Sequence, residues 1–105
     1  MTEPAAEQIK KFWEWCGFRL DYGMWYSPVK DSLGREHGRI APPELDLNNL
    51  FKYAVPKMEA VTIECDNGQT SVRVIKLPNV FYAVNKDPAL ALFWAIWEVI
   101  HKESL

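Results

Sequence analysis

The chain has 105 residues, of which 49% are hydrophobic and 25% are charged, a balance typical of one small globular domain spanning residues 1–105. Its formal net charge of −2 argues against a general nucleic-acid binder, because such proteins usually carry a basic surface. The first residues contain neither a basic start nor an apolar stretch, so no signal peptide is expected. No apolar run reaches the about 20 residues of a membrane span, so no membrane insertion is expected either.

A first helix is predicted from about residue 3 to residue 16, because its apolar residues recur at helical spacing. Thr2 can cap its start, and Gly17 can end it. Trp15 falls beside the apolar stripe. It is either a half-exposed contact for a partner or part of the core.

Residues 18 to 45 are the least regular part of the chain. The alternation on both sides of Gly23 allows a short hairpin, and the Pro and Gly residues that follow break any periodic element. Long loops often carry binding residues, and aromatic side chains are enriched in binding hot spots. Trp25, Tyr26, His37 and Arg39 are therefore candidate partner contacts, the alternative being that the aromatic rings fill the core.

The same segment supports a second hypothesis. Single-stranded nucleic-acid binding sites interleave exposed aromatic side chains with Lys and Arg, and the residues of this chain that come nearest to that pattern are Trp25, Tyr26, Lys30, Arg35 and Arg39. Acidic residues nearby offset these charges, so nucleic-acid binding is kept only as an alternative function.

A second helix is predicted over residues 47–55, with Asp46 as its N-cap. The stretch "VTIECDNGQTSVRVI" then gives two alternating runs around Asn67-Gly68, the typical sequence of a type I′ hairpin turn. A two-residue loop pairs Cys65 with Thr70, and the pairing of the two strands continues from there away from the turn. A third strand at residues 80–84 completes a three-stranded antiparallel meander.

The last helix is predicted over residues 88–102, within "DPALALFWAIWEVI". Asp87 caps it, and Pro88 fits its first position. Its main apolar stripe is long enough to cover a sheet, while Leu90 and Trp94 lie on a second face. That face packs against another helix or forms a self-association face. The elements together predict an α+β fold in which three helices pack with one three-stranded sheet.

The order "LDLNNLFKYAVPKM", hairpin and "DPALALFWAIWEVI" resembles the phage ABA sandwich domain proteins, a group of small phage and prophage proteins. The likeness covers roughly residues 44 to 101. It implies an αβα sandwich with helices on both faces of the sheet. It also implies a cytoplasmic setting in a bacterium or a phage-infected host, and it supplies no catalytic residues.

No catalytic or metal-binding pattern stands out. His37 and His101 are the only histidines, and Cys16 and Cys65 are far apart, without the spacing of a metal site. We therefore expect no catalytic residues, metal or cofactor, and an enzyme with an unrecognised site stays an alternative. The leading hypothesis is a non-enzymatic interaction module that binds another protein or a second copy of itself.

Overall fold

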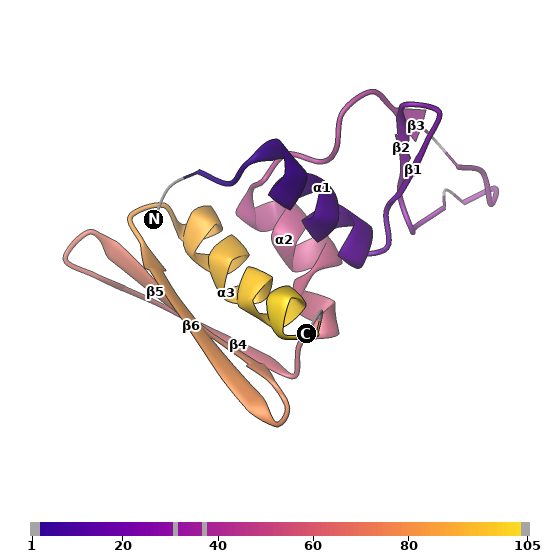
Figure 1. Ribbon diagram of the computed structural model, residues 1–105. Helices are drawn as coiled ribbons and strands as arrows, with labels where there is room; N and C mark the ends of the chain where they lie inside the picture. Colours follow the sequence, from indigo (N-terminus) through magenta and orange to yellow (C-terminus); the bar gives the residue numbers. More distant parts are fainter. Residues whose placement is uncertain (1–2, 31, 37, 104–105) are drawn as a thin grey trace. The chain divides into compact units, whose positions relative to one another are not determined.

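The computed structural model describes residues 3–30, 32–36 and 38–103 (Figure 1). In these residues it has three α-helices and two three-stranded antiparallel sheets, which confirms the α+β class but adds a second sheet. The chain divides into two compact units, Pro4–Pro43 and Glu44–Leu105, the latter together with Met1–Glu3. A single domain over residues 1–105 stays a prediction.

The first unit begins with helix α1 (Ala6–Trp15), which starts later than predicted. The Ala5 N–H donates a hydrogen bond to Oε1 of Gln8, 2.8 Å away, and this contact closes the first turn. Thr2, the expected cap, lies outside the described residues. The end of the helix is as predicted, because Gly17 follows it with a φ of 106°.

The segment predicted to be irregular contains a small sheet. Strands β1 (Arg19–Asp21), β2 (Met24–Tyr26) and β3 (Gly38–Arg39) pair in that order. The predicted hairpin is confirmed, but the prediction of one sheet is wrong. A Cβ on Gly38 would lie 2.9 Å from Cε of Met24 and 3.1 Å from Cε1 of Tyr26, so a larger residue there would have to displace these two side chains of β2.

Aromatic rings pack edge to face within the first unit. The ring centroids of Phe12 and Trp13 are 5.1 Å apart with an interplanar angle of 87°. Those of Trp13 and Phe18 are 5.6 Å apart at 69°. Because such large rings bury much surface, a few of them can fill the interior of a small unit.

The second unit contains the predicted helix–meander–helix order. It runs through helix α2 (Leu47–Tyr53), the 3₁₀-helix η1 (Val55–Lys57), strands β4 (Ala60–Asp66), β5 (Gln69–Lys76) and β6 (Asn79–Asn85), and helix α3 (Pro88–Glu103). Helix α2 ends earlier than predicted, and η1 contains Pro56, which cannot continue an α-helix. The predicted caps are confirmed: Oδ1 of Asp46 accepts from the Asn49 N–H at 2.8 Å, and Oδ1 of Asp87 accepts from the Ala89 N–H at 2.9 Å.

The register of the meander is the predicted one. Cys65 is paired with Thr70 across the Asn67-Gly68 turn, and the pairing continues without interruption along both strands. The Leu77-Pro78 turn, with a cis peptide bond, leads into β6, which is one residue longer at each end than predicted. Continuous pairing means that each side chain of the sheet has a defined face.

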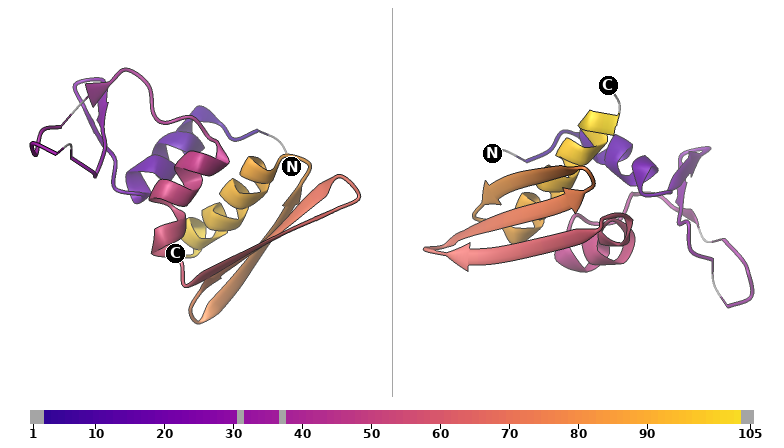
Figure 2. Two further views of the ribbon diagram at one scale, coloured as in Figure 1. Left: turned by 180° about the vertical axis from the view of Figure 1, so that it is seen from behind. Right: turned by 90° about the horizontal axis from the view of Figure 1, so that it is seen from below.

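Helix α3 covers one face of this sheet. It lies against β5 and β6, and helix α2 lies beside it on the same side of the sheet (Figures 1 and 2). Within this unit, the two helices thus cover the sheet from one side, unlike the two-sided sandwich that the resemblance implies. The buried residues of this unit include Leu50, Ala54, Val72, Val74, Ala83, Ala89, Ala91, Leu92, Phe93, Ala95, Ile96, Val99 and Ile100.

Candidate interaction surface

The face of the β4–β6 sheet opposite α3 is formed by every second residue of each strand. Cross-strand partners place these residues in three rows, which run from β4 through β5 to β6. We call this surface the open face. Its residues are Ala60, Ile75 and Val80 in the first row, Thr62, Arg73 and Tyr82 in the second, and Glu64, Ser71 and Val84 in the third.

Strand β6 gives the open face an apolar column. Val80, Tyr82 and Val84 alternate with residues that face α3, and they are 44%, 66% and 49% exposed. Three large apolar or aromatic side chains in one exposed column are more than scattered surface hydrophobics, and such patches often mark binding surfaces. Tyrosine adds a hydroxyl group that can hydrogen-bond at the edge of an apolar contact.

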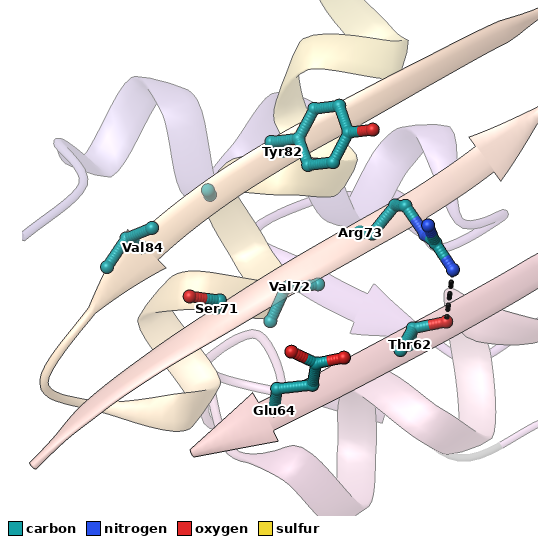
Figure 3. Close-up of a pocket in the computed structure, with 8 residues that line it drawn as sticks. Thr62, Glu64, Ser71, Val72, Arg73, Tyr82 and Val84 are labelled. Carbon is teal, nitrogen blue, oxygen red and sulfur yellow. Dashed lines mark hydrogen bonds between the residues drawn. The ribbon is translucent and has the colours of Figure 1, made fainter. Parts of the chain in front are cut away.

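The centre of the open face is hollowed. A shallow concavity of about 210 Å³ lies between the strands and is lined by side chains of both polar and apolar type (Figure 3). Nη2 of Arg73 lies 3.5 Å from Oγ1 of Thr62, a long hydrogen bond that turns the guanidinium toward β4. Glu64 lies on the same strand as Thr62 (Figure 3). The surface therefore offers one cation, one anion and two hydroxyl groups beside the apolar column, and the hydroxyl group of Tyr82 within it.

Three of the four candidate contacts predicted in the irregular segment, Trp25, Tyr26 and Arg39, lie on the small sheet. Trp25 is paired with Arg39 across β2 and β3. Trp25 is only 7% exposed, so its ring belongs to the interior of the first unit, as the core alternative predicted. Tyr26 is half-buried and Arg39 is exposed.

Arg19 fixes the loop that leads to β3. Its guanidinium lies 4.7 Å from the centroid of the Tyr26 ring and donates two hydrogen bonds, of 3.0 and 3.3 Å, to the carboxylate of Glu36. Such bidentate geometry is stronger and more directional than a single contact. The hydrogen bond to Glu36 raises the pKa of Arg19 above its ordinary value.

The other predicted site residues lie elsewhere. Trp15 is half-buried at the end of α1, and His37 lies outside the described residues. Leu90 and Trp94 are both half-buried on α3, one helical turn apart. Trp15 belongs to the first unit, whereas Leu90 and Trp94 belong to the second.

The described part of the chain contains two thiols and no cluster of metal-binding side chains. No three His, Cys, Asp or Glu side chains of residues 3–30, 32–36 and 38–103 come close enough to hold a metal ion. Neither cysteine forms a disulfide, and Cys16 is buried while Cys65 is exposed. None of the described helices has the length and apolar character needed to cross a membrane.

Sequence reasoning missed the apolar column of the open face. It paired Thr62 with Arg73 and Glu64 with Ser71 but did not extend these rows to the third strand. The parity of β6 relative to β5 would have placed Tyr82 beside Arg73. The alternating sequence of β6 carried this information, but only the length of the turn before β6 tells which of its residues lie on the open face.

Comparison of the chain with models of protein families, with curated proteins and with solved structures gives no match. The likeness to phage ABA sandwich domain proteins therefore stays a prediction.

Proposed function

We propose that this protein is a non-enzymatic interaction module of phage or prophage type, and that it binds another protein through the open face. One observation carries the proposal: Tyr82 is 66% exposed between two exposed valines, on a sheet face that none of the described helices of its unit covers. A rigid sheet holds these side chains at little entropic cost, which favours their use as binding anchors.

The chemistry of the surface indicates the kind of partner. Apolar anchors on β6 suit an apolar segment, and the hydroxyl groups and opposite charges nearer β4 suit a polar rim. The three rows of the open face carry one Arg and one Glu, and Asp66 lies on the same side at the end of β4, so this surface has no positive charge excess that would select a polyanion. A protein surface with a small apolar centre fits this pattern better than a nucleic acid does.

The test compares capture by three baits: the wild-type chain, Tyr82→Ser and Tyr22→Ser. Tyr22 is a matched control, because it is 98% exposed but lies in the first unit. In extracts of the encoding bacterium, we expect a protein that the wild type and Tyr22→Ser retain and that Tyr82→Ser loses at least about tenfold, as expected for a hot-spot residue. Identical retention by all three baits would contradict the proposal.

The nucleic-acid alternative is tested on the same variants. Fluorescence anisotropy with short single-stranded DNA and RNA at low salt should show no saturable binding by the wild-type chain. Salt-dependent binding that Tyr82→Ser leaves unchanged would favour residues 25–39 as a nucleic-acid site and would replace the proposal.

A further inference from the structure

Strand β6 forms an unprotected edge of its sheet. The strand order is β4-β5-β6, and no described strand pairs with the outer side of β6. Its seven residues include no charged residue and no proline, and the pairing with β5 shows no bulge. Edge strands normally carry such features because they prevent pairing with another chain. The opposite edge, β4, has two of them, Glu64 and Asp66.

The backbone groups on this edge belong to the residues of the apolar column. The carbonyl of Ile75 accepts a hydrogen bond from the Glu59 N–H, 2.9 Å away on the β4 side, so Ile75 does not bond to its β6 partner Val80. Hydrogen-bonded and non-bonded pairs alternate along antiparallel strands. The N–H and C=O groups of Val80, Tyr82 and Val84 therefore point away from β5, toward the free edge.

The sequence of β6 is nearly the same in both directions. It is "NVFYAVN", with Tyr82 at its centre. A two-fold axis through Tyr82 would pair this strand with a second copy in antiparallel register. Asn79 would then face Asn85, and Val80 would face Val84.

The same register also suits the side chains of β6 that point toward α3. Phe81 would face Ala83 of the second copy at non-hydrogen-bonded positions, where side chains approach most closely. A large residue opposite a small one fits this spacing. Tyr82 would face its own copy at a hydrogen-bonded position, as the outward direction of its backbone groups requires.

From this edge we infer that two copies of the chain associate through β6, in antiparallel register about Tyr82, to form a continuous six-stranded sheet. The pairing satisfies the outward backbone groups of three residues in each chain and joins the two open faces into one surface. Its contact area is that of one strand pair, so the association is reversible and depends on concentration.

The first experiment is light scattering of the full chain over a concentration series. The mass should rise from 12.2 kDa toward twice that value as concentration increases. Tyr82→Lys should keep the chain monomeric, because the two lysines would face each other across the axis. Ser71→Lys, an exposed position on the central strand, adds the same charge away from the edge and should still dimerise.

The second experiment tests the register by disulfide trapping in a Cys65→Ser background. Tyr82→Cys places the two new thiols opposite each other, at a Cα separation of about 5.5 Å that suits a disulfide. Val84→Cys places the two new thiols several residues apart along the paired strands, because each residue 84 would face Val80 of the second copy. We expect mild oxidation to link two chains of the Tyr82→Cys variant and to leave the Val84→Cys variant mostly unlinked.

The outcomes separate this inference from the proposed function. A wild-type chain that stays monomeric at all concentrations, or a dimer that Tyr82→Lys leaves intact, overturns the β6 pairing. Equal linking of both cysteine variants overturns the register and with it the inference. A monomer that still captures a protein through Tyr82 would leave the proposed function standing.

Discussion

Tyr22 and Asn67 have the same backbone conformation in two different hairpins. Each is the first residue of a two-residue turn, with φ of 51° for Tyr22 and 52° for Asn67, and each is followed by a glycine with φ of 75°. Asparagine tolerates this left-handed region, whereas a bulky aromatic residue rarely occupies it. Tyr22 is also 98% exposed, so buried contacts do not compensate for its conformation.

Exchanging the two residue types should therefore have opposite effects. Tyr22→Asn should raise the free energy of unfolding by about 1 kcal/mol, because it relieves left-handed strain. Asn67→Tyr should lower it by a similar amount. Urea denaturation followed by circular dichroism measures both. A loss of stability in Tyr22→Asn equal to that in Asn67→Tyr would show that Tyr22 makes a stabilising contact.

The resistance of the loop before β3 to proteolysis should depend on the guanidinium group of Arg19. Arg19→Lys keeps the charge but loses the two parallel hydrogen bonds to Glu36 and the planar contact with Tyr26. We expect faster thermolysin cleavage at Val29 and Leu33, which are exposed in that loop. The control Lys30→Arg should cleave at the wild-type rate, and equal rates for both variants would contradict the assigned role.

Two isoleucines with opposite environments give a test of the core. Ile96 on α3 is fully buried, whereas Ile40, next to β3, is 88% exposed. Ile96→Ala should lower the free energy of unfolding by about 3 kcal/mol, through lost burial and the cavity that remains. Ile40→Ala should change it by less than about 0.5 kcal/mol. Chemical denaturation compares them, and similar losses would place Ile40 in a contact that its exposure does not show.

The thiols of Cys16 and Cys65 should differ in reactivity. Cys65 is exposed on β4, and Cys16 is buried at the end of α1. Under native conditions, a thiol reagent should label one site per chain rapidly, and mapping should identify Cys65. Cys16 should react only in denaturant. Fast labelling of both sites would indicate that the first unit opens readily.

The second unit could be predicted because its sequence signals agree with one another. The Asn67-Gly68 turn and the two alternating runs define one register, and both capping aspartates lie where the helices begin. Helix α3 was predicted nearly to its last residue, because its apolar residues have helical spacing between a cap and a charged end. Agreement between local and long-range signals is typical of a well-specified fold.

The first unit could be predicted only in part. β3 has just two residues, too few for a periodic pattern, and the first of them, Gly38, has no side chain that could contribute to one. The candidate contact Trp25 was ambiguous for a related reason: a Trp on a short strand is suited equally to a core and to a surface. Its burial depends on contacts that a single sequence does not display.

Side-chain alternation limits how this gene can change in length. Inserting or deleting one codon within β6 itself would turn the residues beyond the change to the opposite face, so that Tyr82 could be brought toward α3. The Leu77-Pro78 turn can absorb such a change, because hairpin loops of about two to five residues join antiparallel strands. Among natural variants of this chain, length differences should therefore gather in that turn and be missing from β6, as a record of which side of the strand must stay inside.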